Sequence, residues 1–178
     1  GNLYYSLDQK FPIFVNNSAS KFVDSSFKYI NQPIKKGLSF NTKLNLFYSL
    51  YDHGNHQAYL GFGAGPEYVI GNFQKKYFDY TKISILPLYK FKSGDSVFKF
   101  DQIYDQFTLD ITFDQQLFGP IILKTNSTLN LNNSSDDYGE FINSKISLNL
   151  KKRSYEIGIF YQPHNEVGGI NFALFGFE

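Results

Sequence analysis

Cysteine, methionine and tryptophan are all absent from this chain of 178 residues. Without cysteine there is no disulfide framework, no thiolate nucleophile and no cysteine-based metal site. The absence of cysteine does not fix the compartment, because many exported bacterial proteins also lack it. Because a complete translation product begins with methionine, we expect this chain to be processed or cut from something longer.

Long hydrophobic runs and an excess of charge of either sign are also missing. The 17 Lys and Arg residues nearly balance the 16 Asp and Glu residues, and a dedicated nucleic-acid binder would carry a basic excess instead. The apolar runs are only a few residues long, whereas a transmembrane helix needs about 20. What the chain has is aromatic side chains, with 20 Phe and 14 Tyr. Phe and Tyr favour strands, and they also gather at membrane interfaces.

The dominant pattern is alternation with a period of two. In residues 38–50 the even positions are apolar except Thr42, and the odd positions are polar except Phe47. A strand places these two sets on opposite faces, whereas a helix would spread them around its surface. The same pattern recurs at 60–70, 83–91, 107–113, 121–131, 142–150, 155–161 and 170–174, and less regular runs lie near 3–15 and 20–30. We therefore predict about ten antiparallel strands in a single domain over residues 1–178.

Residues typical of turns separate these runs. They occur at 52–55, at Gly119-Pro120, at 132–137, at Lys152-Arg153 and at 164–169. In the second half of the chain, short and long links alternate. Transmembrane barrels have short periplasmic turns and longer outer loops, although hairpins of soluble proteins also show this alternation.

Strand length and the chemistry of the polar faces favour a membrane barrel. Several runs span about 10 to 14 residues, whereas soluble strands average about 5–6 and tilted membrane strands need about 9–11. Charged residues stand in mid-strand on the polar faces, which suits a wet lumen: Lys43, Asp110, Asp114, Lys124 and Lys145. The expected fold is therefore an all-β, antiparallel, up-and-down transmembrane β-barrel of the bacterial outer membrane, part of a larger barrel. A soluble antiparallel sheet with one solvated face would give the same alternation and stays open.

No residue pattern indicates catalysis, a metal or a cofactor. His53, His56 and His164 fall in predicted loops, and a metal site would need a third ligand at suitable geometry. Asp110 and Asp114 share one polar face, but nothing supplies a nucleophile or a perturbing neighbour. No Gly-x-Ser-x-Gly motif occurs. We therefore predict that the protein is not an enzyme.

Three further features concern backbone shape and the membrane. The glycines at 61, 63 and 65 alternate with apolar residues inside a strand, which indicates curvature rather than a phosphate-binding loop. The pairs Lys35-Lys36 and Lys75-Lys76 lie near strand ends, where solvated charge is the favoured interpretation and contact with anionic lipid the alternative. Residues 169–178 resemble the C-terminal signal that the outer-membrane insertion machinery recognises, or else form a buried last strand.

Several motifs resemble, in the same order, those of a cyanobacterial family of unknown function, DUF3769. Residues 93–101 resemble its GESPFLFD-type segment and residues 115–120 its QQLYGP. Residues 152–155 resemble its RRTYG, 161–163 its RYNP and 166–170 its ELGSI. Glu156 replaces the glycine of RRTYG, and Gly176-Phe177-Glu178 replaces the usual aromatic ending. The resemblance covers about the last half of the chain.

The family in turn resembles LptD (OstA), the outer-membrane barrel that inserts lipopolysaccharide. This resemblance implies the C-terminal part of a larger barrel that handles lipopolysaccharide or related lipids. It implies outer-membrane lipid and periplasmic lipid-transport proteins as partners. The C-terminal signal implies the barrel-assembly machinery as a partner, and the charge balance argues against nucleic acid. The resemblance to LptD also implies that Phe172 and Leu174 of the last strand border a lateral seam. A passive porin-like channel and a soluble β-barrel binding module are the alternatives.

Overall fold

The computed structural model describes residues 2–16, 34–51, 54–73, 75–98 and 102–175. These residues contain nine β-strands, the 3-10 turn η4 (Pro163–Asn165) and no α-helix. The strands are β1 (Asn2–Asn16), β2 (Lys36–Leu50), β3 (His56–Ile70), β4 (Thr81–Gly94), β5 (Phe107–Phe118), β6 (Ile121–Asn130), β7 (Phe141–Lys151), β8 (Tyr155–Gln162) and β9 (Val167–Leu174). No helix in this part of the chain is long and apolar enough to cross a membrane.

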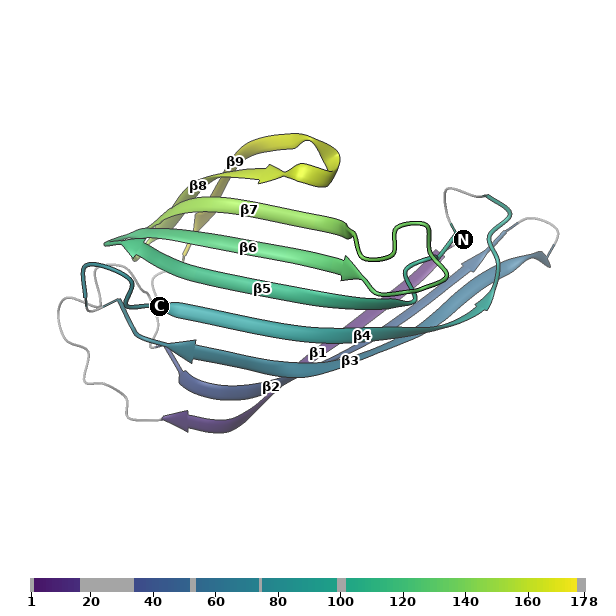
Figure 1. Cartoon of the computed structure of the whole chain (residues 1–178), viewed down its shortest axis with the longest axis horizontal. Coiled ribbons are helices and arrows are strands. Elements are labelled where there is room, and N and C mark those ends of the chain that lie inside the picture. The colour runs from purple at the N-terminus through teal and green to yellow at the C-terminus, as the bar shows by residue number, and fades with distance from the viewer. Residues whose placement is uncertain (1, 17–33, 52–53, 74, 99–101, 176–178) are drawn as a thin grey trace.

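The strands form one antiparallel sheet in which each strand pairs with the next along the chain. Figure 1 shows this up-and-down sheet as a rolled surface that runs from β1 to β9. The prediction of an all-β antiparallel meander is confirmed. The run predicted at 20–30 lies outside the described residues, so nine of the ten expected strands are seen.

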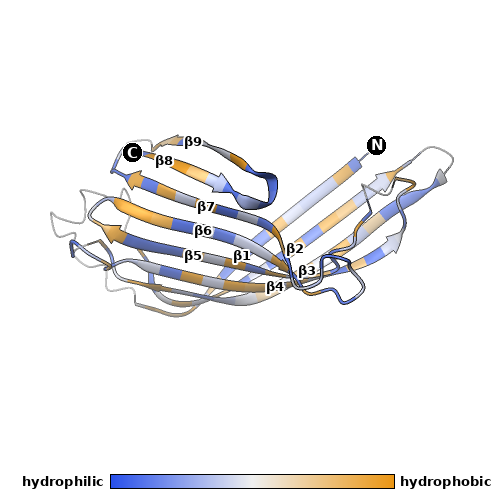
Figure 2. Ribbon diagram, turned by 45° about the horizontal axis from the view of Figure 1, so that its top comes forward, coloured by the Kyte–Doolittle hydropathy of each residue, from blue (hydrophilic) through white to orange (hydrophobic). Residues whose placement is uncertain are grey.

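The pairing register keeps the alternating pattern in phase across the sheet. Leu44 of β2 lies opposite Leu7 of β1 and Phe62 of β3, and Phe62 in turn lies opposite Tyr89 of β4. One face therefore gathers the apolar positions of successive strands, because side chains at directly paired positions point to the same side of a sheet. Figure 2 shows polar and apolar residues alternating along the strands.

Side-chain contacts show which face is concave. The Lys43 ammonium on β2 lies 3.8 Å from the Asp110 carboxylate on β5. On a flat sheet these strands would be roughly 14 Å apart, since neighbouring strands are spaced by about 4.8 Å. The two side chains can meet only if the sheet curls toward the polar face. The polar face is therefore concave and the apolar face convex.

Glycines on β3 allow residues of β4 to pack closely against β3 on the concave face. A Cβ atom on Gly63 would lie 2.8 Å from Leu86 Cδ2, and one on Gly65 would lie 2.0 Å from the Ile85 carbonyl oxygen. Neither position has room for a side chain. This crowding agrees with the prediction that these glycines shape the strand.

Burial is inverted relative to a soluble β-protein. Among the described residues the buried apolar side chains are few: Val69, Phe73, Leu86, Leu88 and Ile122. The buried polar side chains are more numerous and include Gln57, Thr108, Gln116, Asn130 and Asn149. Large apolar side chains are exposed along the strands instead, for example Leu46 at 46% and Phe62 at 54%. Polar groups thus fill the interior of the curl while apolar groups cover its outside.

Two strands have one hydrogen-bonded neighbour each. β1 pairs with β2 alone and β9 pairs with β8 alone, so the described sheet is open between them. Both strands have odd positions in a meander and therefore run in the same direction. Their direct pairing would be parallel, whereas every pair seen here is antiparallel.

Three predicted turns coincide with links between strands: Gly119-Pro120, Lys152-Arg153 within the link 152–154, and 132–137 within the longer link 131–140. The links at 71–80 and 95–106 were not predicted, and two predicted boundaries are wrong. The predicted loop at 164–169 is too long, because β9 already begins at Val167. Gly169 pairs with Phe160 inside the sheet, and a Cβ there would meet the Phe160 ring at 2.9 Å. Likewise, His56 is the first residue of β3 and stacks on Tyr48, rather than lying in a loop.

Candidate functional site

The concave face carries a network of charged and amide side chains that joins strands beyond nearest neighbours. Glu67 on β3 is part of this network, and its side chain is 7% exposed. It is paired with Lys10 of β1, and Lys82 of β4 lies 3.4 Å from its other oxygen. Asn41 Nδ2 donates to the same carboxylate at 3.2 Å. A single buried carboxylate therefore ties four strands together.

A second carboxylate ties three strands together on the far half of the sheet. Glu156 of β8 is paired with Lys124 of β6, and Lys151 of β7 lies 3.5 Å away. Its side chain is 8% exposed. A buried carboxylate is costly unless cations and hydrogen bonds compensate it, and here two lysines do so. Neither Glu67 nor Glu156 is among the residues predicted to face a lumen, although both follow the polar-face alternation that would have marked them.

The residues predicted to face a lumen all lie on this concave face. The register places Asp114 between Lys82 on one neighbouring strand and Lys124 on the other. Lys43 and Asp110 form the ion pair that crosses the curl, and Thr128 Oγ1 donates to Asp110 at 2.8 Å. Lys145 stands apart from these pairs, with its ammonium 4.3 Å from the centre of the Phe160 ring.

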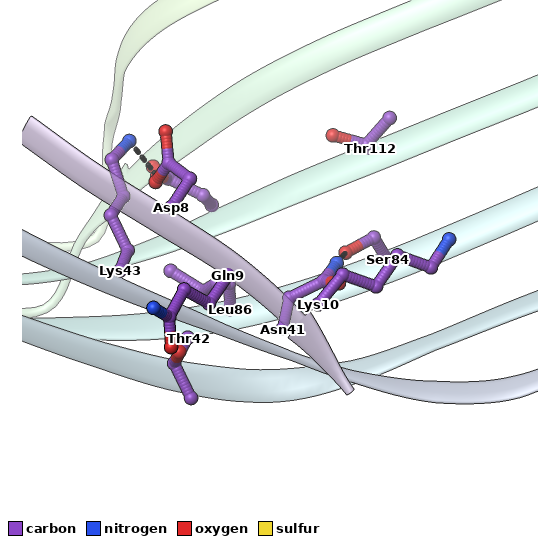
Figure 3. Close-up of a pocket in the computed structure, with 10 residues that line it drawn as sticks. Asp8, Gln9, Lys10, Asn41, Thr42, Lys43, Ser84, Leu86 and Thr112 are labelled. Carbon is purple, nitrogen blue, oxygen red and sulfur yellow. Dashed lines mark hydrogen bonds and ion pairs between the residues drawn. The ribbon is translucent and has the colours of Figure 1, made fainter. Parts of the chain in front are cut away.

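Two adjoining pockets open along this face, and both include Asp110 and Thr112. One, of about 330 Å³, is lined by Asp8, Lys43, Asn41 and Ser84 among others. Figure 3 shows these side chains extending from the ribbons into the same space. The other, of about 320 Å³, is lined mainly by amide and hydroxyl groups together with Lys145. The surface can therefore hold water and polar solutes.

A chain of amides connects the last strand to the network. Asn171 Nδ2 of β9 donates to Asn149 Oδ1 of β7 at 3.1 Å, across the intervening strand β8. The position between them is Gly158, which pairs in register with both. A methyl group there would lie 1.8 Å from Asn149 Oδ1. The absence of a side chain at Gly158 therefore leaves room for the hydrogen bond between β9 and β7 across β8.

The link at 71–80 folds over one end of the concave face. Gln116 of β5 is fully buried and makes four side-chain hydrogen bonds, three of them to this link. Its Oε1 accepts from the backbone N–H groups of Asp79 (3.1 Å) and Tyr80 (3.2 Å). Its Nε2 donates to the carbonyls of Lys75 (3.1 Å) and Gly119 (2.9 Å). Every hydrogen-bonding group of the amide is therefore used, three bonds to fix the link and one to hold the turn at Gly119.

The same link carries the small apolar cluster of this end. Phe73 is 2% exposed, stacks on Tyr80 with ring centres 4.7 Å apart, and packs with Ile34 and Ile122. Its φ of 61° lies in the left-handed region, which is unfavourable for a residue other than glycine. Such a conformation persists only where the surrounding packing holds the residue in place. The cluster lies on the concave side because Ile122 shares a face with Lys124. This arrangement was not predicted, since it depends on contacts between distant segments.

The seam residues proposed for the last strand lie on the convex side of an edge strand. Phe172 is 62% exposed and Leu174 is 74% exposed. β9 has no charged residue and no proline in its eight residues. Natural edge strands usually carry such groups to prevent pairing with other strands. The β9 edge is therefore chemically suited to pair with a further strand.

The described residues contain no group of three or more His, Asp or Glu side chains that could hold a metal ion. His53 lies outside the described residues, and His164 is exposed in η4. A family model described as a protein of unknown function, DUF3769, matches residues 2–178. The chain belongs to this family. The match covers the first half of the chain as well, where the motifs quoted above found no counterpart.

No curated protein and no solved structure matches this chain significantly. The family membership thus carries no activity, ligand or partner with it. What the site can do follows from its geometry: a polar, ion-paired concave face, an apolar convex face and an unpaired strand edge.

Proposed function

We propose that this chain is a segment of an outer-membrane β-barrel, with lipid against the convex face and water in the concave face. The observation that carries the proposal is the inverted burial. In water, an apolar surface as large as this convex face would be a binding site or an aggregation hazard, whereas in a bilayer it is the required surface.

The dimensions of the convex face support this proposal. On β3 the outward apolar residues run from Leu60 to Ile70, both more than 40% exposed. Ten residue steps correspond to roughly 33 Å along a strand, or about 25 Å along the membrane normal at a tilt of about 40°. The lipid-facing band of an outer-membrane barrel is about 25 Å tall.

The open edges support a larger barrel than the nine strands described. Because β1 and β9 run in the same direction, an antiparallel closure needs an odd number of further strands between them. These strands would satisfy the unpaired backbone groups of both edges, which no lipid can do. The described sheet then forms one side of the barrel wall.

Within this setting we propose a role in lipid assembly similar to that of LptD, in which lipopolysaccharide or a related lipid passes between the concave face and the membrane at β9. The uncharged β9 edge supports a seam there, because a strand pair at this edge has no ion pair from β9 to break when it opens. A porin-like channel is the second candidate. It is favoured by the polar pockets of the concave face.

Site-specific photocrosslinking in the intact membrane protein distinguishes these roles. A photoreactive phenylalanine analogue is placed at Phe172 or, as a matched control on the same face, at Phe62 of β3. Lipid assembly predicts lipopolysaccharide or glycolipid adducts at Phe172 in clear excess over Phe62. Equal adducts at both positions, together with steady conductance of small ions across planar bilayers, would instead identify a channel.

A further inference from the structure

The two rims of the sheet carry opposite charge. One rim, called the basic rim, consists of the links at 34–35, 71–80, 119–120 and 152–154. It lies at the side of the sheet where β1 and β9 have their C-terminal ends. Its described link residues include five cations: Lys35, Lys75, Lys76, Lys152 and Arg153. Asp79 is the sole acidic residue among them. Its carboxylate accepts hydrogen bonds from the backbone N–H groups of Asn72 and Lys75 at 3.3 Å.

The opposite rim is acidic. Its links are 51–55, 95–106, 131–140 and 163–166, and their described residues contain no Lys or Arg. They contain six carboxylates: Asp95, Asp105, Asp136, Asp137, Glu140 and Glu166. At the end of β4, Lys92 pairs with Asp95 and Lys90 pairs with Asp105. A balanced net charge thus conceals a separation of charge along the strand direction.

Exposed aromatic rings accompany the cations of the basic rim. Tyr77 forms a bridge with Phe118 at the end of β5, with ring centres 5.1 Å apart, and both rings are exposed. The Lys76 ammonium lies 5.0 Å from the centre of the Phe118 ring and 5.6 Å from that of Tyr77. Phe78 beside them is 66% exposed. Phe118 pairs with Ile121, an apolar-face residue, so the cluster borders the convex surface.

This combination fits the head-group layer of a membrane. Aromatic rings with polar partners settle between the acyl chains and water. Lysines at that depth are attracted by anionic lipid by about 1 kcal/mol each, which is roughly a fivefold local enrichment. The acidic rim at the other end of the strands offers anionic lipid no such attraction. The structure therefore distinguishes the two leaflets chemically.

We propose that the aromatic and basic cluster of Tyr77, Phe118, Lys75 and Lys76 binds the phosphate head group of an anionic phospholipid. The basic rim then lies in the leaflet that contains this lipid. The proposal rests on the membrane function proposed above and adds its orientation and a lipid preference. The two shortest links between described strands, 119–120 and 152–154, belong to the same rim, and outer-membrane barrels have their short turns on the periplasmic side. The anionic phospholipid is therefore assigned to the periplasmic leaflet.

A tryptophan introduced into this chain, which has none of its own, tests this inference; any tryptophan elsewhere in the intact protein is first replaced by phenylalanine. Phe78→Trp places the reporter at the basic rim and Tyr138→Trp places it at the acidic rim. The intact protein is reconstituted into phosphatidylcholine vesicles that contain brominated phosphatidylglycerol or, separately, brominated phosphatidylcholine. Each reporter is also combined with Lys75→Gln/Lys76→Gln, and with Asp136→Asn/Asp137→Asn as a matched charge control.

We expect phosphatidylglycerol to be enriched about fivefold or more over phosphatidylcholine at the Phe78→Trp reporter and not at the Tyr138→Trp reporter. The lysine pair variant or high salt removes this enrichment, and the aspartate pair variant leaves it unchanged. Equal quenching by both lipids at the Phe78→Trp reporter, in protein that inserts normally, would overturn the lipid assignment and leave the membrane function intact. Failure of both reporters to be quenched by any lipid would overturn the membrane function itself.

Discussion

A lysine in the middle of the convex face should destabilise the protein far more than solvent exposure alone suggests. Leu46 of β2 is 46% exposed and lies between Tyr5 and Leu60 of the neighbouring strands. The outward apolar residues of β2 run from Leu38 to Leu50, so Leu46 is two steps from their midpoint. At about 3.3 Å per residue and about 40° of tilt, its depth is roughly 5 Å from the bilayer centre.

For Leu46→Lys we therefore expect a loss of about 2–4 kcal/mol in the free energy of unfolding, the cost of a lysine near the bilayer midplane. An exposed position in a soluble protein would change by less than about 0.5 kcal/mol. The assay is guanidinium unfolding of protein in phospholipid vesicles, followed by circular dichroism. Thr112→Lys, in the wall of the concave pocket, is the control and should cost little. A change below about 0.5 kcal/mol for Leu46→Lys would refute the assignment of the convex face to lipid.

Two further predictions test the interior of the curl. Gly158→Ala should lower the free energy of unfolding by about 1–3 kcal/mol, because the methyl group displaces Asn149 from its hydrogen bond. Gly168→Ala, where a Cβ would lie 3.4 Å from its nearest neighbour, should cost clearly less in the same unfolding assay; equal losses would exclude the proposed role of Gly158. Gln116→Ala should release the link at 71–80 and accelerate tryptic cleavage there by about tenfold or more, since it leaves several backbone groups without partners. Asn126→Ala, an exposed concave-face amide, should leave the cleavage rate unchanged, and the same rate in both variants would count against the clamp.

The strands and their two faces could be predicted from the sequence because alternation is a local signal. The run at 38–50 corresponds to β2 within two residues at its start. In the structure all the residues predicted to face a lumen lie on one face. Once the register of neighbouring strands is set, the side of the sheet to which each residue points is determined. For the same reason Glu67 and Glu156 could have been found, as both occupy polar-face positions.

Long-range contacts could not be predicted in this way. Gln116 bonds to residues more than thirty positions away, and no local pattern indicates that its amide fixes another link. The start of β9 was misplaced because a Gly-Gly pair is typical of a loop, whereas here Gly169 makes room for the ring of Phe160. The charge separation between the rims also required the topology, since it appears only when the links are sorted by the end of the sheet to which they belong.

The central claim is that the convex face requires an apolar environment. The most direct measurement is refolding of the intact protein in detergent micelles and separately in plain buffer, monitored by heat-dependent gel mobility and by circular dichroism. The account predicts a compact, heat-shifted β-species in detergent and none in buffer. A monodisperse β-protein that folds in buffer without detergent would contradict it.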